Sequence, residues 1–129
     1  MDYGINNNLG KPSQNVVNNI LDAAYENGIR TLDCAESYGN SQIVIGNYHS
    51  ISKNRFKLIT KYCSKSKELP NNITKRIEFD ILTLRVKNIY CYMFHSYEDF
   101  ISNYPLFEKE IKNLKEKRLI LKLGVSVYS

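Results

Sequence analysis

The chain of 129 residues has no tryptophan and only three cysteines. Cys34, Cys63 and Cys91 form an odd set without any C-x-x-C pair. An odd number of widely spaced cysteines argues against a disulfide framework and against a zinc site. We therefore expect reduced thiols, most of them packed in the interior, and no bound metal.

No apolar run approaches the roughly 18 residues that a membrane-spanning helix requires. The N-terminal sequence MDYGINNNLGKPS also lacks a basic segment leading into an apolar one, which would indicate a secretory signal. With 43% hydrophobic and 24% charged residues, the composition is typical of a globular protein. These features predict a single domain over residues 1–129 that lies in the cytoplasm and not in a membrane.

The charge pattern gives little support for a nucleic-acid partner. The net charge is +5 and the pI is about 9.1, but the lysines are scattered along the chain. Their densest patch, residues 109–122, mixes glutamates with lysines as a solvent-facing helix does. No strand interleaves aromatic and basic residues as single-strand binders do. We expect no nucleic acid to bind.

Helical and strand-like patterns alternate along the chain. A first helix begins after Ser13, a predicted N-cap, and ends at Gly28. Pro105 lies early in the last helical pattern and is expected to divide it into two pieces. The predicted helices are residues 14–28, 41–49, 73–86 and 99–117, and the predicted strands are residues 29–35, 55–63, 87–97 and 119–128.

This alternation predicts an α/β fold with parallel strands. Two architectures remain open at this point, an open doubly wound sheet and part of a (β/α)8 barrel. No G-x-G-x-x-G motif follows any strand, which removes the best support for a dinucleotide-binding Rossmann unit.

Polar side chains stand at the ends of three predicted strands. Asp33, Lys61 and His95 each lie at the carboxyl end of a separate strand, and Tyr38 lies in the loop after the first of these. In parallel α/β folds, and above all in barrels, chemistry takes place at that end of the sheet. If the three strand-end residues point into a shared interior, alternation places two further sets of residues: Ile59, Cys91 and Met93 on the same face, and Leu58, Tyr92 and Phe94 toward the helices.

These four residue types form a proton-donating set. A buried aspartate is tolerable beside a lysine, because opposite charges within about 4–6 Å favour the ionised form of both. The cationic neighbour makes the Tyr38 phenol a usable proton donor, and His95 can hydrogen-bond a carbonyl oxygen or the phenol. Each residue alone has a structural explanation, such as a helix cap, a snorkelling lysine or a core histidine. The four together favour a pocket in which a carbonyl becomes an alcohol.

The segments GIRTLDCAESYGNSQIVIG, LITKY, YMFH and LGVSVY resemble the aldo-keto reductase family in order and interval. The resemblance implies a (β/α)8 barrel that reduces aldehydes and ketones with NADPH. It carries the family's catalytic tetrad onto Asp33, Tyr38, Lys61 and His95, with Tyr38 as the acid that protonates the carbonyl. It also places Ser126 in the cofactor site.

The sequence departs from the family's usual pattern at a few positions. Cys34 stands where threonine is usual and Gln42 where glutamate is common, and Val127 follows Ser126 where many members carry an asparagine that holds the nicotinamide amide. A full barrel has about 250 residues, and the resemblance covers the family's strands two to five. The remaining strands, whose loops hold the cofactor's phosphates in the family, have no counterpart in these residues.

A half barrel of this kind should associate. Its edge strands, residues 29–35 and 119–128, would expose unpaired backbone groups. We expect a homodimer or a swapped assembly in which two four-stranded halves cover each other's edges. Two functions remain open: an NADPH-dependent reductase of small carbonyl substrates, and a catalytically inactive half barrel that acts as a small oligomerising protein.

Overall fold

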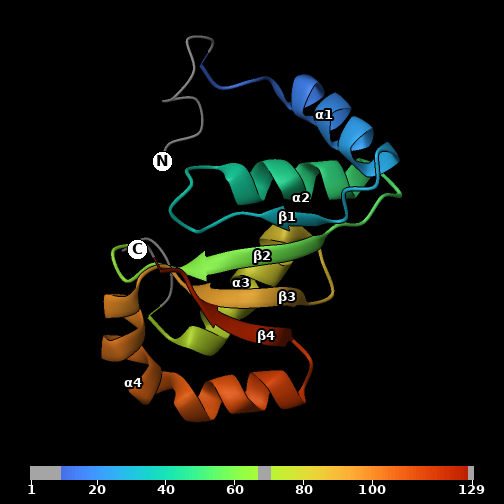
Figure 1. The fold of residues 1–129 in the computed structure, drawn as a ribbon. Coiled ribbons are helices and arrows are strands. Elements are labelled where there is room, and N and C mark those ends of the chain that lie inside the picture. The colour runs from blue at the N-terminus through green and yellow to red at the C-terminus, as the bar shows by residue number, and fades with distance from the viewer. Residues whose placement is uncertain (1–9, 67–70, 128–129) are drawn as a thin grey trace.

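The computed structural model describes residues 10–66 and 71–127. Helices and strands alternate strictly along these residues, as the sequence predicts (Figure 1). The elements are α1 (Gln14–Glu26), β1 (Thr31–Asp33), α2 (Ser41–Ile51), β2 (Lys57–Tyr62), α3 (Ile73–Leu84), β3 (Ile89–Phe94), α4 (Tyr97–Glu116) and β4 (Ile120–Val125). The strands are all shorter than predicted, and β1, with three residues, is the shortest.

The four strands of the described residues form one parallel sheet in the order β1, β2, β3, β4. This order has no reversal, so the sheet lacks the switch point of a doubly wound fold. Neighbouring helices contact one another in the same order, α1 with α2, α2 with α3 and α3 with α4. The architecture is therefore half of a (β/α)8 barrel, and the doubly wound alternative is excluded.

The two faces of the sheet differ in burial as the predicted alternation requires. Leu58, Tyr92 and Phe94 are at most 1% exposed and lie in the core against the helices. Ile59, Cys91 and Met93 are half-buried on the other face, where β2 pairs Ile59 with Cys91 and Lys61 with Met93. We call this second face, defined by Ile59, Lys61, Cys91 and Met93, the open face.

Helix α1 begins and ends where the sequence predicts. The Ser13 side chain accepts a hydrogen bond from the Val16 amide, 3.5 Å away, as an N-cap does. At the other end Gly28 adopts φ +90, and the Ile29 amide donates to the Ala24 carbonyl at 2.9 Å. Glycine is best suited to this helix ending, because the residue after the C-cap adopts a left-handed backbone conformation.

Helix α4 is one helix and not the two that Pro105 suggested. It runs from Tyr97 to Glu116 with Pro105 inside it, and Figure 1 shows that it bends sharply. A proline in a helix removes one backbone donor and clashes with the preceding turn, which bends the helix without ending it when packing holds both parts.

Helices α2 and α3 approach each other unusually closely at Gly46. A Cβ atom added to Gly46 would lie 1.9 Å from the carbonyl oxygen of Thr83. Three residues further along α2, His49 is buried, with Nδ1 2.8 Å from the Leu84 carbonyl oxygen. Burial lowers the pKa of His49, so the neutral ring donates its Nδ1 proton to that carbonyl. These contacts fix α2, which follows directly after the loop that carries Tyr38.

The cysteines are less deeply packed than the sequence predicts. All three cysteines are unpaired thiols, with Cys34 buried and the other two half-buried. Within residues 10–66 and 71–127 there is no group of three or more side chains able to hold a metal. None of the helices described is long and apolar enough to cross a bilayer.

Candidate active site

The structure brings the four predicted polar residues together at the carboxyl end of the sheet. Asp33 is the last residue of β1, Lys61 lies at the end of β2, and His95 directly follows β3. Tyr38 comes from the loop between β1 and α2. Because β1, β2 and β3 are parallel neighbours, their carboxyl ends share one edge of the half barrel.

Lys61 is the centre of this group. Its ammonium forms an ion pair with the Asp33 carboxylate and donates to the Cys34 carbonyl oxygen at 2.9 Å. The Lys61 side chain is 6% exposed, whereas that of Asp33 is 60% exposed. The buried cation is thus compensated by a carboxylate that remains largely hydrated.

The Tyr38 ring lies close to both the lysine and the histidine. The Lys61 Nζ atom is 5.2 Å from the Tyr38 ring centroid. The rings of Tyr38 and His95 meet edge to face, with centroids 6.1 Å apart and planes at 84°. A tight turn sets this position, because the Tyr38 amide donates to the Ala35 carbonyl at 3.0 Å and Gly39 adopts φ +57.

His95 is held as a neutral ring. Burial lowers its pKa, and the neighbouring Lys61 ammonium lowers the pKa further. Its backbone amide donates to the Tyr62 carbonyl at 2.9 Å, which fixes the residue to the end of β2. Among the described residues, Nδ1 is buried and has no hydrogen-bond partner.

Ser126 lies one residue beyond β4 and is half-buried. Its amide donates to the Phe94 carbonyl at 2.9 Å, so it stands beside the strand end that carries His95. The residue predicted from the resemblance to belong to the cofactor site is therefore at the same edge of the sheet as the other four.

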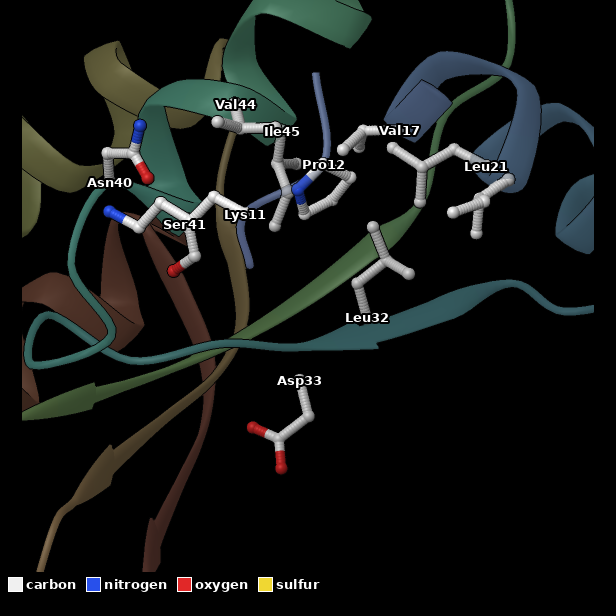
Figure 2. Close-up of a pocket in the computed structure, with 11 residues that line it drawn as sticks. Lys11, Pro12, Val17, Leu21, Leu32, Asp33, Asn40, Ser41, Val44 and Ile45 are labelled. Carbon is white, nitrogen blue, oxygen red and sulfur yellow. The ribbon is translucent and has the colours of Figure 1, made fainter. Parts of the chain in front are cut away.

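Two hollows border this edge. The first, about 280 Å³, is largely apolar and lies on the helix side of β1 between α1 and α2. Figure 2 shows Leu32 pointing toward it and Asp33 pointing away from it, so the four polar residues do not converge there. The second, about 660 Å³, includes His95 and is lined by Cys63, Ser64, Lys65, His95, Ser96, Glu98, Asp99, Ser102 and Asn103. We call this second cavity the polar hollow.

A buried ionic cluster behind the site was not predicted. Glu36 and Arg76 form an ion pair at 2.8 Å with side chains 0% and 3% exposed, and Asp80 is buried beside them. Arg76 and Asp80 are four residues apart and adjoin the apolar face of α3. That spacing is the one sequence feature that could have indicated the buried cluster. It does not predict burial, because a charged pair on a helix usually faces solvent.

Gln42 also has a defined role in the fold. It is buried, and its side-chain amide donates to the Thr60 hydroxyl at 2.7 Å, on the helix side of β2. The structure thus places a neutral amide–hydroxyl pair at the position where the resemblance leads us to expect glutamate.

The fold is half of a (β/α)8 barrel, and the candidate site lies at the carboxyl ends of its strands. The sequence model of the aldo/keto reductase family matches residues 1–129 of this chain. The chain therefore belongs to the aldo/keto reductase family. A search of curated protein sequences found no match.

Solved structures of the family have the same fold. A Pseudomonas aeruginosa protein assigned as an aldo-keto reductase matches with a TM-score of 0.76 at 20% identity, over 98% of this chain and 51% of that one. An aldo-keto reductase from Klebsiella pneumoniae in complex with NADPH matches at 0.67 and 21% identity, over 87% and 39% of the two chains. The glycerol dehydrogenase of Gluconobacter oxydans matches at 0.73 and 25% identity, over 93% and 41%. The chain thus spans about half the length of these proteins, or less.

Proposed function

We propose that the chain carries the catalytic residues of an NADPH-dependent reductase of small aldehydes or ketones. The observation that carries the proposal is the position of Lys61, whose ammonium contacts the Asp33 carboxylate and lies 5.2 Å from the Tyr38 ring centroid. A phenol beside a compensated, buried cation is suited to release a proton, because the cation stabilises the phenolate that remains.

In this proposal Tyr38 gives its phenolic proton to the carbonyl oxygen as the carbonyl carbon is reduced to an alcohol. Lys61 stabilises the resulting phenolate, and the ion pair with Asp33 orients Lys61. The phenol then regains a proton from water. His95, neutral because burial lowers its pKa, hydrogen-bonds the carbonyl oxygen and orients the substrate.

The residues at this edge fit the reacting end of a nicotinamide cofactor. Ser126 is at the end of β4, beside His95, whose Nδ1 is buried without a partner in the described residues. We assign Ser126 to the nicotinamide end of the site. NADPH, when bound, supplies the hydride. The NADPH complex of the Klebsiella pneumoniae relative supports the choice of cofactor.

The polar hollow favours a hydroxylated substrate. Its polar groups come from serine, asparagine, lysine and carboxylate side chains, although carbon atoms form the larger part of its surface, and it shares His95 with the catalytic group. Such a lining leaves polar groups unpaired against an apolar aldehyde and satisfies them with a short hydroxy-aldehyde or hydroxy-ketone. The relative that is a glycerol dehydrogenase supports this class of substrate.

We further propose that two copies of the chain assemble edge to edge. Within the described residues, β1 pairs only with β2 and β4 pairs only with β3. A two-fold axis along the strands would place β4 of one copy beside β1 of the other in the same direction, which closes a parallel eight-stranded barrel. The apolar hollow between α1 and β1 would receive the outward side chains of that added strand (Figure 2).

The test is to titrate NADPH while following its fluorescence, and then to follow its oxidation with glyceraldehyde as substrate. We expect saturable binding and turnover. Tyr38→Phe, which removes only the hydroxyl, should keep the binding and lower the rate by at least about 100-fold. The absence of any saturable change would refute the reductase and favour the alternative, a half barrel that assembles but binds no cofactor.

A further inference from the structure

The Glu36 carboxylate is bound by three different parts of the fold. Its two oxygens accept from Arg76 Nε at 3.0 and 2.9 Å, and Arg76 Nη2 lies 2.8 Å from Oε2. The Tyr92 hydroxyl donates to Oε1 at 2.8 Å, and the Cys63 amide donates to Oε2 at 3.1 Å. We call Glu36, Arg76 and Tyr92 the clamp.

The clamp connects the strand ends that carry the proposed catalytic residues. Glu36 belongs to the loop between Asp33 and Tyr38. Cys63 is two residues after Lys61. Tyr92 is in β3, three residues before His95, and Arg76 is in the first turn of α3. The Glu36 carboxylate thus joins the loop after β1 to the residue that follows β2 and to β3.

The backbone alone holds this loop weakly at its centre. The Glu36 amide reaches the Lys61 carbonyl at 3.3 Å, a long hydrogen bond, and the Tyr38 amide bonds within its own turn. The Glu36 side chain is 0% exposed and Arg76 is 3% exposed. Charge-assisted hydrogen bonds in such a buried position are strong and directional, and a fork of guanidinium donors restricts the carboxylate to one position.

Arg76 is fixed on its other side as well. Its Nη2 donates to the Cys63 carbonyl at 2.8 Å, and its guanidinium carbon lies 4.5 Å from the Tyr62 ring centroid. The guanidinium is therefore anchored to the end of β2 independently of Glu36. It serves as a fixed point against which the loop is positioned.

We infer that Glu36, Arg76 and Tyr92 are positioning residues, which hold the loop after β1 so that the Tyr38 ring stays close to both Lys61 and His95. The claim that this position of Tyr38 serves catalysis rests on the proposed function. The position of the Tyr38 ring can be tested without turnover.

A matched pair of substitutions separates positioning from general stability. Tyr92→Phe removes a buried hydroxyl that donates to Glu36, and Tyr48→Phe removes a buried hydroxyl that donates to Asp22 at 2.6 Å. Tyr92 and Tyr48 are 0% and 1% exposed. The Tyr48–Asp22 hydrogen bond joins α2 to α1, and neither residue forms a hydrogen bond with the clamp in the described part of the chain. Both variants lose one charge-assisted hydrogen bond, and Tyr48→Phe also loses the bond that Asn54 Nδ2 donates to the Tyr48 hydroxyl at 3.0 Å. Only Tyr92→Phe should affect Tyr38.

The readout is the NMR signal of the His95 ring protons, which the edge-to-face Tyr38 ring shifts. The chain has two histidines, so a His95→Asn variant assigns the signals. Tyr38→Leu gives the value without the neighbouring ring. We expect Tyr92→Phe to move the His95 shift part of the way toward that value, Arg76→Met further, and Arg76→Lys less than Arg76→Met. Tyr48→Phe should leave the shift unchanged.

If Tyr92→Phe and Arg76→Lys, both folded, give the wild-type His95 shift, the inference is overturned. Should Arg76→Met fail to fold, these two variants decide the question. With turnover available, we expect Tyr92→Phe to lower kcat by about tenfold with KM within twofold, and Tyr48→Phe to change neither. Absence of turnover in the wild type would refute the proposed function and leave the NMR test of the clamp intact.

Discussion

Lys61 and Asp33 form an ion pair whose members differ sharply in environment, since the lysine side chain is 6% exposed and the aspartate 60%. The buried lysine therefore needs a compensating charge, whereas the exposed aspartate can be stabilised by water. An Asp33 carboxylate left alone would stay hydrated, whereas a Lys61 ammonium left alone would be buried and unpaired apart from the Cys34 carbonyl. This asymmetry leads to the first prediction.

Lys61→Met should separate activity from stability. It removes the cation beside Tyr38 and should lower the rate of carbonyl reduction by at least about 100-fold. The unfolding free energy should change by only about 1 kcal/mol, because the remaining carboxylate is exposed. Lys57→Met, on the same strand, is the matched control and should retain activity. Urea unfolding and NADPH oxidation measure the two effects, and equal rates for both variants would contradict the assigned role.

Gly46→Ala should destabilise the fold by about 1–3 kcal/mol or more. The added Cβ would lie 1.9 Å from the Thr83 carbonyl oxygen, which is backbone and cannot rotate away. Asn47→Ala, at the exposed neighbouring position of the same helix, is the control. Thermal or urea unfolding of both variants is the measurement. A Gly46→Ala protein as stable as the control would mean that α2 and α3 do not approach this closely.

Asp80→Asn should change how stability depends on pH. Burial, together with the nearby Glu36 carboxylate, raises the pKa of Asp80 from 3.8 to about 8. The folded chain therefore binds one more proton than the unfolded chain between these two values. Stability should fall as pH rises through that window, by at most about 1.4 kcal/mol per pH unit, and should level off above it.

The measurement is urea unfolding at pH 5, 7 and 9. The variant lacks the titrating proton, so its stability relative to the wild type should increase toward pH 9. Burial also raises the pKa of Glu36, which adds a slope of the same sign to both proteins. Glu78→Gln, on the exposed face of the same helix, is the control. A stability difference between wild type and Asp80→Asn that is constant with pH would contradict the assignment.

Light scattering should give a mass of twice 15.0 kDa for the chain at micromolar concentration. Ile20→Glu places a charge beside the apolar hollow next to β1 and should shift the protein to a folded monomer. Ile101→Glu is the control, because Ile101 on α4 is 52% exposed, close to the 56% of Ile20. A folded wild-type monomer, or equal effects of both variants, would refute edge-to-edge assembly.

Much of the fold follows from patterns within short stretches of the sequence. The spacing of Ile73, Ile77 and Ile81 predicts α3, and Ser13 and Gly28 bound α1 because capping depends on a few adjacent residues. Strand parity placed Tyr92 and Phe94 toward the helices, since alternation is a property of one strand. The convergence of Asp33, Lys61 and His95 followed from parallel strands alone, because their carboxyl ends share one edge.

Other features were decided only by the tertiary structure. The pairing of Glu36 with Arg76, 40 residues apart, depends on how α3 is seated against the ends of β2 and β3. The raised pKa of Asp80 and the close approach at Gly46 depend likewise on the packing of neighbouring helices. Local periodicity determines which face of an element is buried. Which polar groups meet behind that face depends on the register and crossing of elements distant in sequence, and those are set only when the whole core packs.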